Sequence, residues 1–539
     1  MSNHKGLRSR PGPVGVDVRG VLQVLAAILS GMLLLLISPP IGIPWLHWFS
    51  FVPMFWALRE EQHGKNFTLA YVTGFFGVGS CFFWLTESII RFSNLGVGIA
   101  YLCLALFALA FALPYAVVYT LTHPLRQKYG AWWVVLIPAL LVAVEFIGPA
   151  LFPYYQGVSQ YRSPWAFQLT SVTGVTGVSF LILLTNCALA ECVYRHREGR
   201  PLPFKILGAV AAVFSANLIF GAIRTNKVQA EVAEWPTIRV TQLQQSISME
   251  DRMSGTARAA MLEWYQMTNE LAGQDIDLVV WPEGSTPYDP RSARVTTLLG
   301  DLAKNMDAPI LFGGGFAEKR VDPLTGRNYT EQRNSIYLMS KEGELVQRYD
   351  KMVPLPFGEY LPFADTFPIL KEWIKGPGDF EAGTVPVQFE LEHPTAGTIQ
   401  MTSPICYEAI LNTFVRKNLG ESQLFVNVTN DGWFGDTAAP HQHAMLSAVR
   451  SVENGVPMIR LAYTGISMHV DPTGYTTNET EPFTRVVRVL TTPVGRIRTI
   501  YSIIGDLFSW LCVLVMAGTI IHAIVDWRRL SVTPEKDAA

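Results

Sequence analysis

Charged residues are scarce in this sequence. They make up 16% of its 539 residues, whereas about 25% is usual in a soluble globular protein, and 49% of the residues are hydrophobic. The formal net charge is -2, so the chain has no basic excess of the kind that binds nucleic acid. This balance argues against a nucleic-acid partner and indicates a chain that lies partly in a membrane.

Cysteine is also scarce, and its distribution is uneven. Of 6 cysteines, five lie in or beside long apolar stretches, namely Cys81, Cys103, Cys187, Cys192 and Cys512. The sixth, Cys406, is the only cysteine in the one large polar segment of the chain. A lone cysteine cannot form a disulfide within that segment. It is therefore either a small buried hydrophobe or a chemically reactive group.

Signatures of several other functions are missing. The glycine-rich FGGGF at 312–316 lacks the Lys-Ser/Thr ending of a phosphate-binding loop. His441 and His443 lie two residues apart before a predicted helix, with no acidic or cysteine ligand at metal spacing. We therefore predict no cofactor and no metal.

Long apolar stretches fill the chain before about residue 224 and after about residue 500. Crossing a bilayer takes roughly 20 mostly apolar residues. The pattern predicts eight membrane spans, at about 20–38, 42–58, 67–89, 95–120, 131–152, 165–190, 204–223 and 502–525. The second is short, and a re-entrant hairpin arm after Pro39-Pro40 is the alternative. The first lacks the small-x-small cleavage site of a signal peptide.

The loops between these spans carry Lys and Arg mainly on one side. The basic residues occupy the N-terminal tail, the loops near 59–65, 126–128 and 195–205, and the C-terminal tail. Since such residues stay in the cytoplasm, both termini are predicted to be cytoplasmic.

This orientation divides the chain into three parts. We predict a membrane domain of about seven helices at 1–227, a domain on the outer face of the membrane at 228–497, and a last membrane helix with a cytoplasmic tail at 498–539.

The polar segment alternates β-rich runs with helical patterns. Strands are predicted at 238–244, 277–283, 309–316, 334–340, 398–408, 424–431, 457–463 and 466–472. The stretch SKEGELVQRYDK reads as the turn and second arm of a hairpin. Continuous apolar strands beside amphipathic helices indicate an α/β domain with sheets buried under helices.

Three chemically complementary residues stand at predicted strand ends. Glu283 lies in VVWPEGS, Lys351 in RYDKMVP and Cys406 in TSPICYEAI. A carboxylate can deprotonate a thiol, and an ammonium can stabilise the thiolate and an oxyanion, so this set suffices for acyl transfer through a thioester. Taken singly, Glu283 also fits a helix cap or salt bridge, and Lys351 a surface charge.

Longer motifs surround these residues. WPE (281–283), YDK (349–351), FGEYLPF (357–363) and ICYE (405–408) occur in the order found in the nitrilase (carbon–nitrogen hydrolase) superfamily, which the segment resembles. VTNDGWFG (428–435) also matches. The whole chain resembles the apolipoprotein N-acyltransferase family, membrane enzymes that complete bacterial lipoproteins. The resemblance implies a polytopic α-helical membrane domain plus a nitrilase-like α-β-β-α sandwich. It also implies that the membrane is a bacterial inner (cytoplasmic) membrane and that the domain at 228–497 is periplasmic and catalytic.

The resemblance also implies roles for the site residues. Glu283 would be the general base, Lys351 the oxyanion-stabilising residue and Cys406 the nucleophile. The backbone N–H of Tyr407 would complete the oxyanion hole.

Two acidic residues join them as active-site support. Glu359 matches a further acidic residue of the family's site, where it would either hold Lys351 in place or handle protons. Tyr407 and Glu408 match residues that flank the nucleophile.

The family's reaction involves two lipid partners. The acyl donor would be a membrane phospholipid, typically phosphatidylethanolamine, and the acceptor the α-amine of the S-diacylglyceryl-cysteine of an apolipoprotein. The family suggests a monomer. We also expect the segment 359–380 to dip toward the bilayer or gate the site, and the segment 149–164, with Arg162, to face the domain.

Two other functions fit parts of the sequence. A membrane-anchored amidase or nitrilase would use the same three residues on a small amide, although one helix would suffice as its anchor. A transporter would suit eight spans, but ionisable residues within the spans are few, chiefly Glu87 and Glu145, and Cys406 would have no role.

Overall fold

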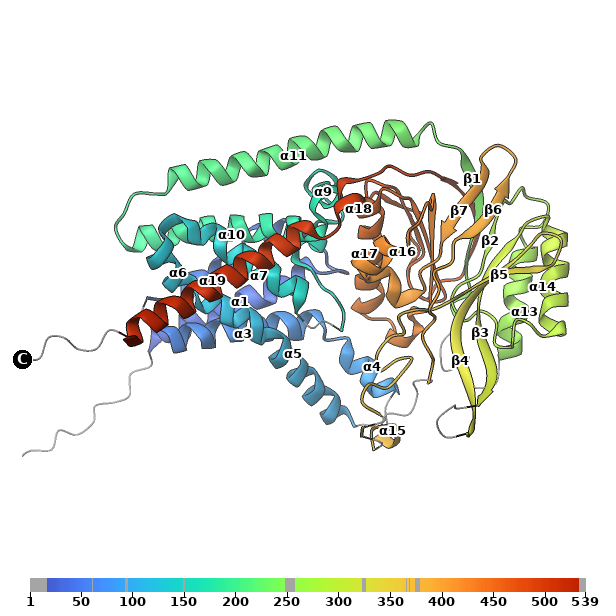
Figure 1. Cartoon of the computed structure of the whole chain (residues 1–539), viewed down its shortest axis with the longest axis horizontal. Coiled ribbons are helices and arrows are strands. Elements are labelled where there is room, and N and C mark those ends of the chain that lie inside the picture. Colours follow the sequence, from blue (N-terminus) through green and yellow to red (C-terminus); the bar gives the residue numbers. More distant parts are fainter. Residues whose placement is uncertain are drawn as a thin grey trace, which may run out of the picture.

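The chain folds into a helical half and a β-rich half that lie side by side (Figure 1). The computed structural model describes residues 17–60, 62–92, 96–148, 151–247, 257–321, 326–364, 366–367, 369–373 and 379–532. The long helix α11 (Phe204–Val232) runs from the helical half to the first strand of the other, and α19 (Leu507–Val532) returns among the helices.

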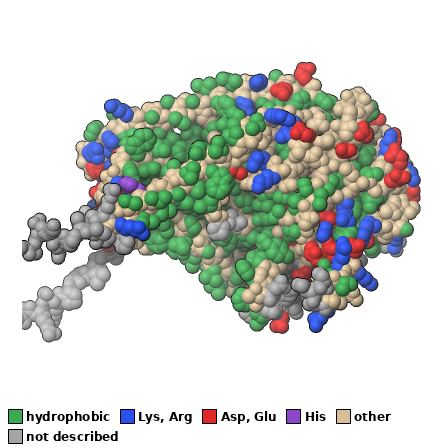
Figure 2. All heavy atoms as spheres, viewed as in Figure 1, with side chains coloured by type: hydrophobic (Ala, Val, Ile, Leu, Met, Phe, Trp, Pro, Cys, Tyr) green, Lys and Arg blue, Asp and Glu red, His purple; other side chains and the backbone are tan. Residues whose placement is uncertain are grey.

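The helical half consists of long apolar helices linked by short ones. They are α1 (Val18–Ile37), η1 (Pro44–Trp48), α2 (Val52–Ala57), α3 (His63–Cys81), α4 (Leu85–Phe92), α5 (Val97–Thr120), α6 (Thr122–Tyr129), η2 (Gly130–Trp132), α7 (Trp133–Ile147), η3 (Gln156–Gln160), α8 (Pro164–Phe167), α9 (Thr170–Thr173) and α10 (Val175–Arg197). Many apolar side chains are exposed on the surface of this half, such as Leu102, Leu106 and Leu113 of α5. Figure 2 shows hydrophobic side chains over most of this half, as expected of a surface that faces lipid.

The number of apolar helices differs from the sequence prediction. Among the described residues, five helices are long and apolar enough to cross a membrane, or up to six if the bent pair formed by α3 and α4 is one span. The predicted span at 42–58 is instead η1 and α2, and proline lies at the start of each. Proline ends one helix and begins another, so an apolar stretch need not form a single helix.

The β-rich half contains two large sheets and one small one. Strands β11 (Thr476–Thr477), β10 (Met468–Val470), β9 (Met458–Ala462), β8 (Leu424–Thr429), β7 (Gly397–Thr402) and β6 (Phe389–His393) are adjacent in the first. The second contains β2 (Val279–Val280), β3 (Ile310–Val321), β4 (Asn328–Met339) and β5 (Leu345–Asp350). β1 (Thr237–Gln244) pairs antiparallel with β12 (Val486–Pro493).

Helices cover the outer face of each sheet. α13 (Ala257–Asn269) and α14 (Ala293–Met306) share an apolar core with β2 and β3, while α16 (Asn412–Asn418) and α17 (Ala438–Asn454) pack on the strands β8 to β10. Between the sheets, Val280 and Ile336 meet Ile399 and Val426 in a core that excludes water. The predicted α-β-β-α sandwich is therefore confirmed. The predicted hairpin is β4 and β5, joined by a turn in which the Ser340 N–H donates to the carbonyl of Glu344.

The two halves share a hydrophobic core. Tyr155 and Val178 of the helical half pack with Ile410 and Val449 of the β-rich half, and none of these four side chains is exposed by more than 5%. A buried interface of this kind holds the β-rich half in a fixed position relative to the membrane helices. The short helix α18 (Ile500–Ile504) completes the link to α19.

Candidate active site

Cys406 occupies a tight turn between two elements of the first sheet. It follows the end of β7 by four residues and begins the short helix η4 (Cys406–Ile410). Its φ of 48° lies in the left-handed region, which is uncommon for a residue other than glycine and typical of functional sites. The side chain is only 6% exposed. The fold thus presents a buried thiol on a sharp turn.

Lys351 and the two predicted acids come together in space. Lys351 follows β5 and Glu283 lies after β2, so the second sheet supplies both residues. The Lys351 Nζ atom is 2.6 Å from a carboxylate oxygen of Glu359 and 3.5 Å from one of Glu283. All three side chains are at least 87% buried. Charges that are buried this deeply need partners, and each of these has one.

Asn334, in the middle of β4, holds both carboxylates. Its amide nitrogen donates to Glu283 at 2.6 Å and to Glu359 at 2.7 Å. The other oxygen of Glu283 accepts from the backbone N–H of Asn430 at 2.8 Å, and Glu359 accepts from that of Leu355 at 2.7 Å. Asn334 was not predicted as a site residue, because a polar residue inside a strand has no local signature.

The thiol does not ionise readily in this setting. Burial raises the pKa of Cys406 well above its usual range, and Glu283 raises it further, whereas Lys351 lowers it. Burial also lowers the pKa of Lys351, but Glu359 and Glu283 outweigh burial and the net shift is upward. Lys351 therefore remains cationic, and the thiol needs a base to remove its proton.

Glu408 links the cysteine turn to the segment that carries Lys351. One carboxylate oxygen accepts from the backbone N–H groups of Met352 and Val353, at 2.7 and 3.0 Å, and from the Tyr349 hydroxyl at 2.9 Å. The other accepts from the Ile405 N–H at 2.8 Å. Burial raises the pKa of Glu408 to about 7. This fully buried side chain fixes Cys406 and Lys351 relative to each other.

Tyr407 joins the site to the helical half. Its hydroxyl donates to the backbone carbonyl of Leu151 at 2.7 Å, and its ring meets that of Phe152 edge to face. Burial raises the pKa of Tyr407 to about 12, so the hydroxyl stays protonated. The prediction that the segment 149–164 faces the domain is confirmed for its described residues, since 149–150 lie outside them.

An apolar pocket opens beside the thiol. Cys406, Leu355, Phe434 and Leu446 line it, with Trp84 of the helical half. It shares Phe82, Phe152 and Tyr154 with a larger cavity of about 170 Å³ among α3, α5 and α7. The thiol therefore faces an apolar region that continues between the membrane helices.

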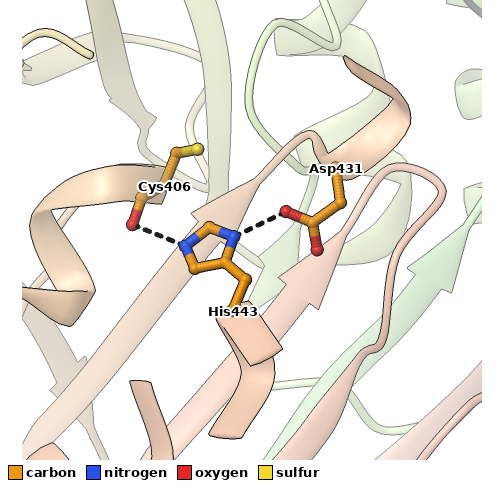
Figure 3. A group of neighbouring side chains, drawn as sticks. All are labelled: Cys406, Asp431 and His443. Carbon is orange, nitrogen blue, oxygen red and sulfur yellow. Dashed lines mark hydrogen bonds and ion pairs between the residues drawn. The ribbon is translucent and has the colours of Figure 1, made fainter. Parts of the chain in front are cut away.

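A second group of side chains lies around the cysteine. Figure 3 shows His443, from α17, between Cys406 and Asp431 of η5 (Asp431–Phe434). The three offer ligand atoms within 4.8 Å of one another, as a metal site would. However, both oxygens of Asp431 are already engaged, one by His443 at 2.7 Å and the other by Arg460 at 2.8 Å. We interpret the group as a hydrogen-bonded network, which sequence spacing did not reveal.

Two further features predicted from the sequence lie at the edge of the site. Arg162, in the segment expected to face the domain, forms an ion pair with Glu479 of the β-rich half at 2.7 Å. The segment 359–380 lies partly outside the described residues, because 365, 368 and 374–378 are not among them. Its described aromatics Phe363 and Phe367 are 71% and 57% exposed, so the predicted approach to the bilayer stays a prediction.

Comparison with known proteins identifies the family. The profile of the apolipoprotein N-acyltransferase N-terminal domain matches residues 30–188, and that of the carbon-nitrogen hydrolases matches residues 237–500. The apolipoprotein N-acyltransferase of Geobacter metallireducens is 30% identical over 94% of this chain and 96% of its own. The chain belongs to the apolipoprotein N-acyltransferase family. The resemblance inferred from the motifs is thereby confirmed.

Other relatives agree with this assignment. The apolipoprotein N-acyltransferase of Bradyrhizobium diazoefficiens is 27% identical over 90% of this chain and 92% of its own. Among solved structures, an amidase from a Nesterenkonia species covers 48% of this chain and 90% of its own, at 18% identity and a TM-score of 0.34. The match to the family's membrane domain does not favour the membrane-anchored amidase as an alternative.

Proposed function

We propose that this enzyme transfers a fatty acyl chain from a membrane phospholipid to the α-amine of an S-diacylglyceryl-cysteine on apolipoproteins, through a thioester on Cys406. The observation that carries the proposal is the position of that thiol. It lies beside a buried Glu–Lys pair and opens onto an apolar pocket that continues among the membrane helices. Phosphatidylethanolamine is the proposed donor.

The first half of the reaction forms the thioester. Glu283 takes the proton of the Cys406 thiol, and the thiolate attacks the carbonyl carbon of a phospholipid ester. Lys351 and the backbone N–H of Tyr407 hold the resulting oxyanion. As the tetrahedral intermediate collapses, the C–O bond breaks and Glu283 returns the proton to the leaving lysophospholipid oxygen.

The second half transfers the acyl group to the amine. The neutral α-amine of the diacylglyceryl-cysteine attacks the thioester carbonyl, and Glu283 accepts a proton from the nitrogen. The C–S bond then breaks, the amide forms, and the Cys406 thiol is regenerated. The same three side chains therefore serve both halves of a ping-pong cycle, with lysophospholipid leaving before the acceptor reacts.

The apolar pocket supports lipid substrates. Moving an acyl chain out of a bilayer into water costs about 0.8 kcal/mol per CH₂. A pocket shared by Trp84 and Phe152 of the helical half with Phe434 of the β-rich half lets the ester carbonyl reach Cys406 while the chain stays in an apolar environment. A small amide would need none of this surface.

The Lys and Arg residues of the loops support an orientation in the membrane. We place the helical half in the bacterial inner membrane with both termini cytoplasmic, and the domain at 228–497 in the periplasm. The proposed boundary at 227 falls within α11, ten residues before β1, and the boundary at 497 falls four residues after β12. We further propose that one copy suffices for the reaction, because each residue in the scheme comes from one chain.

The test is intact-protein mass spectrometry of purified protein incubated with phosphatidylethanolamine. Wild type should gain the mass of one fatty acyl group, which hydroxylamine removes, and a diacylglyceryl peptide should discharge it. Cys406→Ser should gain no hydroxylamine-sensitive mass. Cys512→Ser is the matched control, because that cysteine lies in α19, and it should behave as wild type. Failure to form an adduct with any phospholipid, together with turnover of small amides, would instead establish an amidase.

A further inference from the structure

Both ring nitrogens of His443 face hydrogen-bond acceptors. Nδ1 lies 2.7 Å from an oxygen of Asp431, and Nε2 lies 3.2 Å from the backbone carbonyl oxygen of Cys406. A carbonyl oxygen can only accept, and so can an ionised carboxylate. A neutral imidazole has one N–H and could satisfy only one of the two. Both contacts are hydrogen bonds only if both ring nitrogens carry a proton.

Asp431 is held in its ionised form. Its second oxygen receives a hydrogen bond from the Arg460 guanidinium at 2.8 Å, and both side chains are completely buried. Burial by itself would raise the pKa of Asp431, but Arg460 and His443 outweigh it and lower that pKa to about 2. The carboxylate therefore accepts from His443 and cannot donate to it.

We propose that His443 is an imidazolium that positions Cys406 and places a second positive charge beside its thiol. The proposal deepens the acyl-transfer function proposed above, on which it rests. His443 donates to the Asp431 carboxylate with one nitrogen and to the Cys406 carbonyl with the other. It acts through the nucleophile and does not itself meet the reacting carbonyl.

The contact with the carbonyl supports the shape of the turn. Cys406 has a φ of 48°, which costs free energy in a residue with a Cβ atom unless the surroundings hold it in place. The Glu408 N–H donates to the Ile405 carbonyl on one side of the turn, and His443 donates to the Cys406 carbonyl on the other. The imidazolium thus fixes the peptide group that follows the nucleophile.

The positive charge of His443 would offset part of the negative charge around the thiol. Glu283 and Asp431 both oppose its ionisation, whereas Lys351 favours it. A thiolate at Cys406 is therefore repelled by two carboxylates and attracted by one ammonium. A protonated His443 supplies a second cation within 4.8 Å of the sulfur and makes the thiolate easier to form.

The orientation of the thiol excludes a simpler role for His443. In cysteine proteases a histidine takes the proton of the nucleophilic thiol directly. Here the carbonyl oxygen of Cys406, not its sulfur, points at the imidazole, and the sulfur is directed away (Figure 3). His443 is therefore a positioning residue, and removal of the thiol proton is left to Glu283.

The experiment measures how readily the thiol ionises, without any lipid. Purified full-length protein in lipid nanodiscs is treated with iodoacetamide across a range of pH, and modification of the Cys406 peptide is followed by mass spectrometry. The charged groups that surround the thiol and the imidazole are Glu283 after β2, Lys351 after β5, Asp431 on η5 and Arg460 on β9. These four residues are unchanged in every variant, so a change in the dependence of the alkylation rate on pH is attributable to the substitution of His443.

His443→Gln should slow the alkylation of Cys406 by about tenfold at neutral pH and shift the pH–rate curve upward by about one unit, because glutamine can donate but carries no charge. His443→Arg restores a cation and should return the curve toward wild type. His441→Gln is the matched control. His441 lies on the same helix but lines a different cavity beside Arg162 and Glu481, so this variant should leave the curve unchanged.

A folded His443→Gln protein with the wild-type curve would overturn the proposal. If that variant does not fold, a measurement on the wild-type protein tests the proposal instead. Protein labelled with ¹⁵N-histidine should show, at neutral pH, an imidazole with both ring nitrogens protonated, as the two hydrogen bonds of His443 require. The absence of such a signal would overturn the proposal as well. Neither readout uses a phospholipid or lipoprotein, so either result is independent of whether acyl transfer itself is observed.

Discussion

The ammonium of Lys351 lies 2.6 Å from Glu359 but 3.5 Å from Glu283. The shorter contact is an ion pair that anchors the lysine. The Asn334 amide donates to both acids, and Glu283 also accepts from the Asn430 N–H. In the proposed mechanism, Glu359 fixes the position of the cation and Glu283 transfers the proton.

This difference predicts unequal losses of activity. Glu283→Gln should lower the rate of thioester formation by about a thousandfold, because a general base contributes 10² to 10⁴. Glu359→Gln should lower it by about tenfold to a hundredfold, because the glutamine keeps a hydrogen bond to Lys351 but not the charge. Mass spectrometry of the acylated protein gives both rates. Glu372→Gln, an exposed residue of α15 (Leu370–Trp373), is the control. Equal losses for both acids would contradict the assignment.

Glu408→Gln should destabilise the protein and slow acylation together. The amide group of glutamine would place N–H donors where the carboxylate now accepts from Met352, Val353 and Ile405. A buried donor without a partner costs about 1–3 kcal/mol, so the free energy of unfolding should fall by at least that much. Thermal unfolding in detergent measures the loss. Glu390→Gln, on an exposed position of β6, should leave the melting temperature unchanged. An unchanged melting temperature in Glu408→Gln would show that the hydrogen bonds accepted by Glu408 do not contribute to stability.

Ala439→Leu should slow the acylation of Cys406 by a phospholipid without slowing its alkylation by a small reagent. Ala439 is 3% exposed and lines the pocket beside Cys406, so the larger side chain would fill space that an acyl chain needs. Acylation by long-chain phosphatidylethanolamine should fall at least tenfold, while alkylation by iodoacetamide should change little. The neighbouring Ala438→Leu serves as control, because Ala438 is partly exposed and does not line the pocket. An equal loss of both reactions would mean that the substitution disturbs the thiol itself.

The ion pair of Asp431 with Arg460 predicts acid sensitivity. The pKa of Asp431 is lowered from 3.8 to about 2, so folding favours its ionised form. The resulting stabilisation is present above about pH 4 and is lost as the pH falls toward about 2, and it amounts to about 2 kcal/mol. Asp431→Asn should lower stability at neutral pH and show a weaker pH dependence than wild type between about pH 4 and 2. Thermal unfolding across that range tests this, and identical slopes would refute it.

Part of the candidate site could be predicted because its residues stand at predicted strand ends and in motifs of the family. Those features selected Glu283, Lys351 and Cys406, but their wide separation in the sequence did not show that they meet in space. The network of Asp431, His443 and Arg460 could not be inferred. Those residues lie on three elements, and only the packing of α17 against β9 and η5 brings them together.

Membrane spans were harder to predict than the α/β domain. Hydropathy detects an apolar stretch but not the point at which it breaks. The stretch 42–58 breaks into η1 and α2, and 131–152 yields an α7 of only 15 residues. The strands of the α/β domain, by contrast, were predicted from short continuous apolar runs between turn residues, and central strands such as β8 and β9 are buried along their whole length.

The hydrogen bond from Tyr407 to Leu151 ties the residue after Cys406 to the chain between two apolar helices. In the proposed orientation, the height of the thiol above the bilayer centre is therefore a property of the protein and not of the lipid around it. Thicker or thinner membranes would move the ester bonds of their lipids relative to this fixed point. Bilayer thickness itself then becomes a variable that sets which phospholipids present their ester carbonyl at the correct depth.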